Sequence, residues 1–269
     1  MSIKKKVSGF VLNKAMDYIS CDPETNLPKL LNLLDTLGVK AFEPQSEVFH
    51  EVLDNPDNNW YKFIMRLWRD IDNDVLKAVF QNFALNTYLL GYPKKLELME
   101  KYGCNVPMAM LIDPTSACNL KCIGCWAAEY GNKLNMSYET LDSIVTQGKE
   151  LGTYLYLFSG GEPLVRKADI LRLCEKHSDC QFGAFTNGTL IDDDFAKAIL
   201  RLGNFIPIIS LEGFEEETDF RRGVGTYEKV EKAALLLRSY RLPFGFSSCY
   251  TSVNVEVIGS EEYFDQMIE

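Results

Sequence analysis

The sequence predicts an α/β fold in which a helical N-terminal region, residues 1–103, precedes a region with a parallel sheet, residues 104–269. In the first region, apolar residues recur at helical spacing. From Pro107 onward, short apolar runs alternate with helical patterns, and this alternation is typical of parallel strands joined by crossover helices. The polar and glycine-rich segments of the second region follow these runs, where ligand sites of parallel sheets lie.

Four stretches of the N-terminal region have the spacing of helices; they cover residues 26–37, 59–69, 73–90 and 94–102. Asn26 and Pro28 open the first stretch, and we expect Gly38 to close it. Gly91 and Pro93 are expected to end the third stretch. The aromatic residues in these stretches predict a packed core rather than a cofactor site.

Five strands are predicted in the second region, at residues 108–113, 154–159, 181–186, 206–211 and 244–250. Helices are expected to start at Ser137 and Asp192, acting as N-caps, near Lys167, and at Thr226. After the fifth strand only the start of one more helix follows, and no sixth strand is visible. We therefore expect that more chain follows in the native protein, or that the last strand is absent or supplied otherwise, and that the unpaired edge promotes self-association.

The composition fits a globular protein of 269 residues, with 46% hydrophobic and 25% charged residues. The formal net charge of -10 argues against an electrostatic grip on nucleic acid. No apolar run approaches the length of about 20 residues that spans a bilayer, and no signal-peptide core follows the basic start. We expect a cytoplasmic, reducing location.

The three cysteines Cys118, Cys122 and Cys125 lie together after the first predicted strand. An ordinary [4Fe–4S] electron carrier uses four cysteines. Three thiolates on a short loop hold three irons and leave the fourth iron open to a substrate or cofactor. The spacing therefore points toward chemistry.

A structural zinc site is the alternative interpretation of these cysteines. It needs a further ligand, either Cys104 or one of the two histidines, His50 and His177. Four other cysteines show no ligand spacing; they are Cys21, Cys174, Cys180 and Cys249. Most of these four are expected to be buried apolar residues.

Three further segments follow the second, third and fourth strands; they are Ser159-Gly160-Gly161-Glu162-Pro163, Thr186-Asn187-Gly188 and Ile209-Ser210-Leu211-Glu212-Gly213. With the cysteine loop, and in this order, they resemble the radical SAM superfamily over about residue 108 to the C-terminus. The resemblance implies a partial (βα)6 barrel, a [4Fe–4S] cluster on the three cysteines and bound S-adenosyl-L-methionine (SAM). It also implies reductive cleavage of SAM to methionine and a 5′-deoxyadenosyl radical, which acts on an unidentified peptide or small molecule, and an electron donor such as ferredoxin or flavodoxin.

The resemblance also assigns the SAM contacts. Gly160, Gly161, Glu162 and Pro163 are expected to receive the methionine moiety, because bare glycine backbone allows a close approach. A side chain at Gly161 is then expected to block SAM and to spare the cluster. Asn187 is expected to bond the cofactor or to cap a turn.

Ser210 and Glu212 share one face of the fourth strand, because strand side chains alternate, and this face is expected to line the barrel interior. By resemblance, Arg222 pairs with the SAM carboxylate, with Arg221 competing for that role. Gly124 stands where the family often has an aromatic residue, so the adenine contact falls to backbone or to Trp126.

Three hypotheses follow from the sequence. The favoured one is a radical SAM enzyme. The others are a SAM-binding iron–sulfur protein that is catalytically incomplete, and a zinc-stabilised interaction module.

Overall fold

The computed structural model describes residues 3–36 and 43–268. Five parallel strands form one sheet in the order β1-β2-β3-β4-β5, which confirms the predicted α/β class. Their bounds are β1 Ala109–Ile112, β2 Leu155–Phe158, β3 Gln181–Thr186, β4 Phe205–Ser210 and β5 Gly245–Ser247. Neighbouring strands pair in register, so their carboxyl ends lie along one edge of the sheet.

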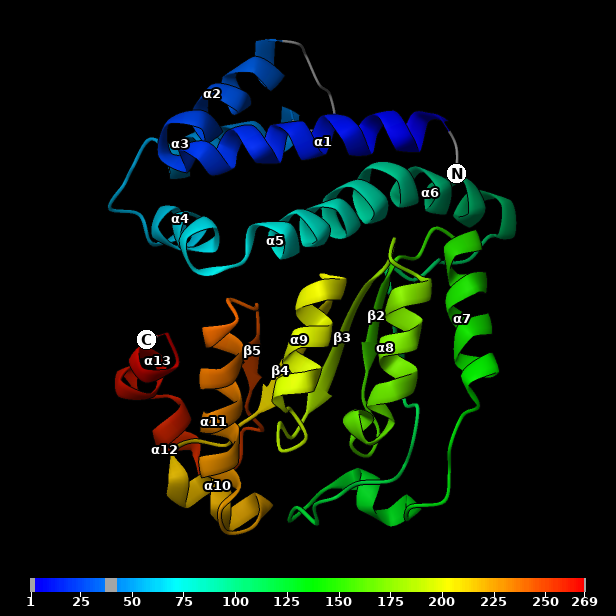
Figure 1. Ribbon diagram of the computed structural model, residues 1–269, viewed down its shortest axis with the longest axis vertical. Coiled ribbons are helices and arrows are strands. Elements are labelled where there is room, and N and C mark those ends of the chain that lie inside the picture. Colours follow the sequence, from blue (N-terminus) through cyan, green and yellow to red (C-terminus); the bar gives the residue numbers. More distant parts are fainter. Residues whose placement is uncertain (1–2, 37–42, 269) are drawn as a thin grey trace.

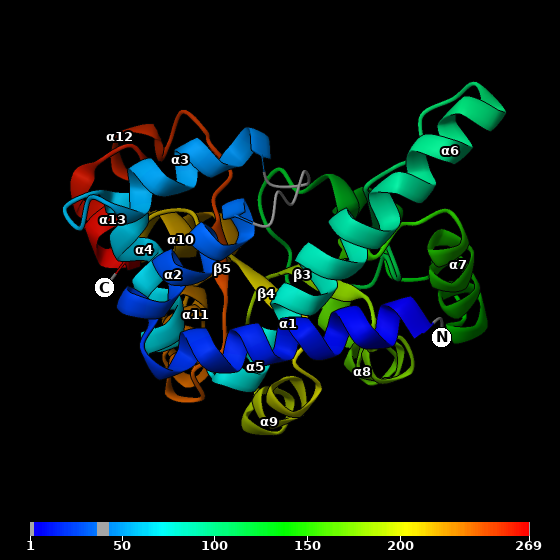
Figure 2. The same cartoon turned by 90° about the horizontal axis from the view of Figure 1, so that it is seen from above.

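Helices cover the outer face of the sheet (Figures 1 and 2). They are α7 Tyr138–Glu150, α8 Lys167–Lys176, α9 Asp193–Leu202 and α11 Thr226–Ser239. Ser137 and Asp192 cap α7 and α9 as predicted, since their side chains accept from Thr140 N and Phe195 N. The shorter elements are η2 Trp126–Tyr130, η3 Pro163–Arg166, α10 Glu215–Arg222, α12 Val255–Ile258 and α13 Glu261–Ile268.

The core lies between the outer face and these helices. Phe158 and Phe182 stack on neighbouring strands with ring centroids 6.0 Å apart, and both are fully buried. The opposite, inner face is more open: Leu111 is 63% exposed, and Ile206 and Ile208 are half-buried. Alternation along each strand thus separates a closed core from an apolar inner face.

The strand β5 is shorter than predicted. After Ser247, the backbone N–H of Cys249 donates to the Glu212 carboxylate (2.9 Å), and the Cys249 carbonyl accepts from the Asn254 side chain (2.9 Å). Side chains therefore take the place of a ladder partner here, and regular pairing ends.

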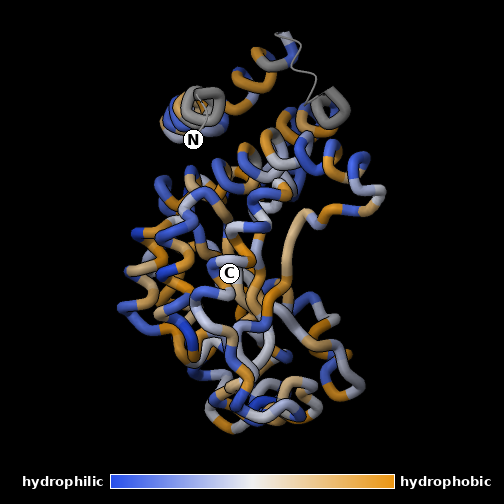
Figure 3. The backbone as a smooth tube through the Cα atoms, turned by 90° about the vertical axis from the view of Figure 1, so that its right-hand side faces the viewer, coloured by the Kyte–Doolittle hydropathy of each residue, from blue (hydrophilic) through white to orange (hydrophobic). Residues whose placement is uncertain are grey.

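The helical N-terminal region lies across the amino end of the sheet, opposite the loops that follow the strands (Figure 1). Its helices are α1 Ile3–Cys21, α2 Pro23–Thr36, α3 Glu43–Leu53, α4 Asn59–Asp70, α5 Asn73–Phe80, the π-helix η1 Gln81–Gly91 and α6 Tyr92–Tyr102. Apolar and polar residues alternate around their turns (Figure 3). None of the helices within residues 3–36 and 43–268 has both the length and the apolarity needed to cross a bilayer.

Buried amides fasten this region to the sheet. The Asn82 amide donates to the carbonyls of Ser178 (3.2 Å) and Cys180 (3.1 Å), and the Asn86 amide donates to Asp179 O (2.9 Å). These carbonyls belong to the loop that enters β3. The contact gives the buried side chains of Asn82 and Asn86 hydrogen-bond partners and joins η1 to the sheet.

Two predicted helix boundaries in this region are wrong. The third helix does not end at Gly91: α5, η1 and α6 follow one another without a gap, and Pro93 lies inside this run, where the π-helix passes into α6. Glycine is needed at Gly91 for packing, because a Cβ there would lie 2.4 Å from Gly152 O.

The first predicted helix also starts earlier than expected. The helix α2 begins at Pro23, with Asp22 accepting from Thr25 N (3.2 Å), so that Pro28 lies inside it. The predicted stop at Gly38 lies outside the described residues. The stop at Gly103 is confirmed, since that glycine has a φ of 64° at the end of α6.

Candidate active site

The loop after β2 forms backbone hydrogen bonds with residues 115–117, which precede the first motif cysteine, Cys118. Gly161 N donates to Thr115 O (2.9 Å), and Glu162 N donates to Ala117 O (2.8 Å). The glycine motif and the cysteine loop are therefore one structural unit at the carboxyl end of β1 and β2.

Both glycines of this unit are required by close approach. Gly160 has a φ of 100°, and a Cβ there would lie 2.7 Å from Thr115 O. A Cβ on Gly161 would lie 2.3 Å from Ala117 O and 2.6 Å from Ser116 C. These neighbours are backbone atoms of the cysteine run, so glycine serves the packing of the two motifs as well as any approach of a ligand.

Glu162 joins the second motif to the third. Its carboxylate is 1% exposed and accepts from Leu164 N (2.9 Å), Thr186 Oγ1 (2.7 Å) and Asn187 N (2.7 Å). Burial raises the pKa of this carboxyl, and the three hydrogen bonds oppose that rise. Pro163 is buried at the first turn of η3. The Glu162 side chain thus fixes the end of β3 against the glycine loop.

Asn187 lies at the carboxyl end of β3, as predicted, and its side-chain amide contacts the cysteine loop. Its Nδ2 donates to Asn119 Oδ1 (2.8 Å), and its Oδ1 accepts from Thr189 N (3.0 Å). Asn119, which follows Cys118, was not singled out from the sequence. Its place inside the cysteine motif was the available signal.

The three motif cysteines are free and half-buried. Cys118 Sγ accepts from Leu120 N (3.4 Å), and Cys122 Sγ accepts from Arg222 Nη1 (3.9 Å). Burial raises the pKa of both thiols, and the positive charge of Arg222 lowers that of Cys122. Donors aimed at sulfur suit bound thiolates, so these residues fit an iron–sulfur cluster.

The zinc alternative needs a further ligand close to the three motif cysteines. Cys104 and His177 precede β1 and β3, and so lie at the amino end of the sheet, while His50 lies in α3. All three are remote from the cysteine loop.

Glu212, just after β4, forms ion pairs with α10 and a hydrogen bond with the segment after β5. It is 1% exposed and pairs with both Arg221 and Arg222, whose Nε lies 2.9 Å from Glu212 Oε1. Its other oxygen accepts from Cys249 N (2.9 Å). Both arginines come from α10, which the sequence patterns did not predict. The Arg222 guanidinium thereby lies between Glu212 and Cys122.

Ser210 ends β4 on the inner face, as predicted, opposite Ser247 of β5. Trp126 begins η2 and is 56% exposed, with its ring set edge-to-face on Tyr130. A cavity of about 540 Å³ is lined by residues that include Trp126, Tyr130, Gly160 and Gly161. The indole therefore shares a cavity with the glycine motif.

The prediction that most of the other cysteines are buried is half correct. Cys174 and Cys180 are buried, whereas Cys21 and Cys249 are exposed. Cys249 follows β5 at the same edge of the sheet as the motifs. Its position near the carboxyl end of the predicted strand 244–250 was the signal for this placement.

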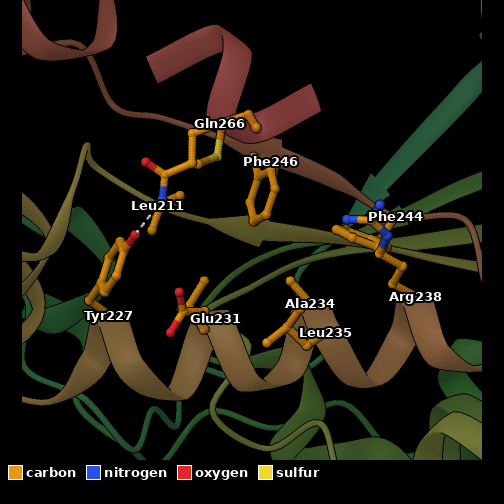
Figure 4. A pocket seen from close by; sticks show the side chains of 11 residues that line it. Leu211, Tyr227, Glu231, Ala234, Leu235, Arg238, Phe244, Phe246 and Gln266 are labelled. Carbon is orange, nitrogen blue, oxygen red and sulfur yellow. Dashed lines mark hydrogen bonds between the residues drawn. The ribbon is translucent and has the colours of Figure 1, made fainter. Parts of the chain in front are cut away.

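A second cavity, of about 170 Å³, lies between α11, β5 and α13 (Figure 4). Tyr227 and Gln266 are hydrogen-bonded at one end of it (3.0 Å). Phe244 and Phe246 are among its apolar lining residues. It contains none of the predicted site residues.

The cysteine loop, the glycine motif and two further strand ends meet at one edge of a parallel sheet, and a known family has the same order of motifs. The sequence profile of the radical SAM superfamily matches residues 112–263. The chain belongs to this superfamily. Membership implies a [4Fe–4S] cluster and SAM as cofactors.

Among relatives in this superfamily, a cysteine-type anaerobic sulfatase-maturating enzyme of Clostridium perfringens is 32% identical over 167 residues, which cover 54% of this chain and 45% of the relative. An Fe-coproporphyrin III synthase of Methanosarcina barkeri is 37% identical over 116 residues, covering 41% and 28% of the two chains. The chain thus spans about half, or less, of the length of such relatives.

Solved structures agree on the fold. A structure of anSMEcpe with bound AdoMet and the Kp18Cys peptide superimposes with a TM-score of 0.52 at 29% identity, covering 59% of this chain and 48% of that one. Streptococcus suis SuiB bound to its precursor peptide SuiA gives a TM-score of 0.55 at 22% identity, covering 67% and 41%. The matches support the partial-barrel fold of the radical SAM superfamily.

Proposed function

We propose that this chain carries out reductive cleavage of SAM at the carboxyl end of its sheet. The observation that supports this most directly is the joining of four motifs by hydrogen bonds. Gly161 and Glu162 bond the cysteine run, Glu162 bonds the end of β3, and Arg222 reaches from Glu212 to Cys122. Motifs that served only as turns would not need to be joined in this way.

Cys118, Cys122 and Cys125 are the residues that would hold the cluster. A bound [4Fe–4S] cluster and SAM together supply a one-electron cleavage that yields methionine and a 5′-deoxyadenosyl radical, which takes hydrogen from a substrate. The chain's own part is to place these groups and to keep water out. The apolar inner face, with Leu111, Ile206 and Ile208, lies next to the site and serves that exclusion.

The SAM contacts form part of the proposal. Backbone carbonyls near Gly160 and Gly161 would accept from the ammonium of the methionine moiety. Ser210 and Asn187 would contribute from the ends of β4 and β3. Trp126 is exposed beside the glycine motif and would contact the adenine. Arg222 would meet the SAM carboxylate only by turning from Glu212 and Cys122, which it bonds in the structure.

The substrate and the electron donor are the remaining parts. Relatives are named for sulfatase maturation, for PqqA peptide cyclisation and for Fe-coproporphyrin III synthesis. We propose an organic substrate, peptide or small molecule, that reaches the site, and a low-potential donor of the ferredoxin or flavodoxin type.

The test is anaerobic reconstitution followed by reduction with dithionite in the presence of SAM. We expect about four irons per chain and the formation of 5′-deoxyadenosine, measured by chromatography. Replacing Cys118, Cys122 or Cys125 by Ala should abolish both. The exposed Cys21→Ser serves as a matched control, since it lies in α1.

Three outcomes separate the hypotheses. Bound iron and SAM without 5′-deoxyadenosine would favour the catalytically incomplete protein. Zinc in place of iron would favour the interaction module. Full iron retention in Cys122→Ala would contradict the assignment of the ligands.

A further inference from the structure

Between Ala117 and Ile123, the cysteine loop is held by hydrogen bonds to three other segments. Ala117 O accepts from Glu162 N (2.8 Å), on the amino side of Cys118. Ile123 N donates to Arg221 O (2.8 Å), beside Cys122. The third attachment is made by the side chain of Asn119, directly after Cys118. All three attachments join protein atoms to protein atoms, so none of them requires a bound cluster.

The Asn119 attachment is a closed ring of hydrogen bonds. Asn119 Oδ1 accepts from Asn187 Nδ2 (2.8 Å), and Asn119 Nδ2 donates to Thr189 Oγ1 (2.8 Å). Thr189 Oγ1 in turn donates to Asn187 Oδ1 (2.7 Å). Each of the three side chains both donates and accepts, so only one orientation of each amide satisfies the ring.

We infer that Asn119 is a positioning residue that sets the place of Cys118 before the cluster binds, acting through Asn187 and Thr189. The inference rests on the proposed function, since it takes the cysteine loop as the cluster site. Asn187 is buried and fixed at the end of β3, because Glu162 accepts from its backbone N–H. The ring therefore connects the cysteine loop to the end of β3, and loops are in general more mobile than strand ends.

The physical benefit is preorganisation. A loop that is already ordered loses less conformational entropy when it takes up a ligand. With Ala117 O bonded on one side of Cys118 and Asn119 on the other, the backbone of this cysteine is fixed from both sides. The Asn187 amide is then engaged in holding the loop, which competes with the predicted role of this side chain toward SAM.

The test compares Asn119→Ala, Thr189→Val and Thr189→Ser with the wild-type chain. Lys121→Ala is the matched control, since Lys121 is an exposed residue of the same loop. The first readout is hydrogen exchange over residues 116–126 in the cluster-free protein. Asn119→Ala removes two hydrogen bonds of the ring and should open this segment about five- to 150-fold more often, since one net hydrogen bond is worth about two- to twelvefold in a local equilibrium.

The second readout is the cluster itself, by iron content and by the electron paramagnetic resonance spectrum of the reduced protein. We expect less iron and broadened signals in Asn119→Ala, a weaker effect in Thr189→Val, and rescue in Thr189→Ser, which keeps the hydroxyl. Lys121→Ala should match the wild type in exchange, iron content and spectrum.

Unchanged exchange and iron content in Asn119→Ala would overturn the inference. So would a Thr189→Ser variant as impaired as Thr189→Val, since the hydroxyl would then not be the active group. If the wild-type chain takes up no cluster, the proposed function fails, whereas the exchange measurement on cluster-free protein still reports whether the ring orders the loop.

Discussion

Gly161→Ala tests the contact between the glycine motif and the cysteine loop. The new Cβ would lie 2.6 Å from Ser116 C and 2.3 Å from Ala117 O. Favourable carbon–carbon contacts lie at about 3.5 Å or more, so the first of these distances is short by about 0.9 Å. Both neighbours are backbone atoms and cannot rotate away, so one of the two segments has to shift.

The shift has a calculable cost. It breaks or stretches the bonds from Gly161 N to Thr115 O and from Glu162 N to Ala117 O. Two hydrogen bonds at about 0.5–1.5 kcal/mol each, with overpacking of about 1–3 kcal/mol, predict a loss of about 2–6 kcal/mol in the free energy of unfolding. Because the segment that shifts leads into Cys118, iron content should fall as well.

The assay is urea unfolding of cluster-free protein together with iron content after reconstitution. Gly245→Ala is the control, since a Cβ at that position would meet nothing within 4 Å. We expect the control to match or slightly exceed wild-type stability. A Gly161→Ala variant that kept full stability and iron and lost only SAM affinity would refute this reasoning.

Two further predictions concern the amino end of the sheet. Burial lowers the pKa of His177, although the hydrogen bond to Asp142 opposes this effect. The folded state therefore binds a proton at His177 less readily than the unfolded state, in which a histidine has a pKa of about 6.5. The free energy of unfolding should therefore fall as the pH drops below about 6.5 toward the lower folded pKa, and the slope should flatten in His177→Gln; equal slopes in urea titrations would contradict this. Asn82→Ala removes a side-chain donor from Ser178 O and from Cys180 O, of which only Cys180 O keeps a second one, Asn204 Nδ2, and it should cost about 1–3 kcal/mol in urea unfolding. The exposed Asn132→Ala is its control, and a loss no greater than that of the control would show that water replaces the amide.

The strands and the motif positions could be predicted because they depend on local pattern. Short apolar runs predicted the strands, and the N-cap residues Ser137 and Asp192 predicted where two of the helices begin. The order of the motifs then placed the site at the carboxyl ends of the strands. The helix end predicted at Gly91 is wrong because glycine occurs both at helix ends and at close contacts between backbones. At Gly91 glycine permits contact with Gly152 rather than ending a helix, and only tertiary structure separates these cases.

The partners within the site were less accessible from sequence. Glu162 and Glu212 were predicted as cofactor residues, yet their carboxylates are bonded to Asn187 and to the arginines Arg221 and Arg222. The role of Asn119 depends on Thr189, which lies far along the chain. Such pairings arise from the meeting of strand ends, so they carry no periodic signature.

The position of the helical layer has a consequence for access. It covers the amino end of the sheet, and the family profile begins only at residue 112, after this layer. A protein that docked on α1–α6 would therefore stand on the far side of the sheet from the cysteine loop. It would leave the approach to that loop unobstructed, so a carrier bound to the helices and a substrate at the strand ends would not compete for the same space.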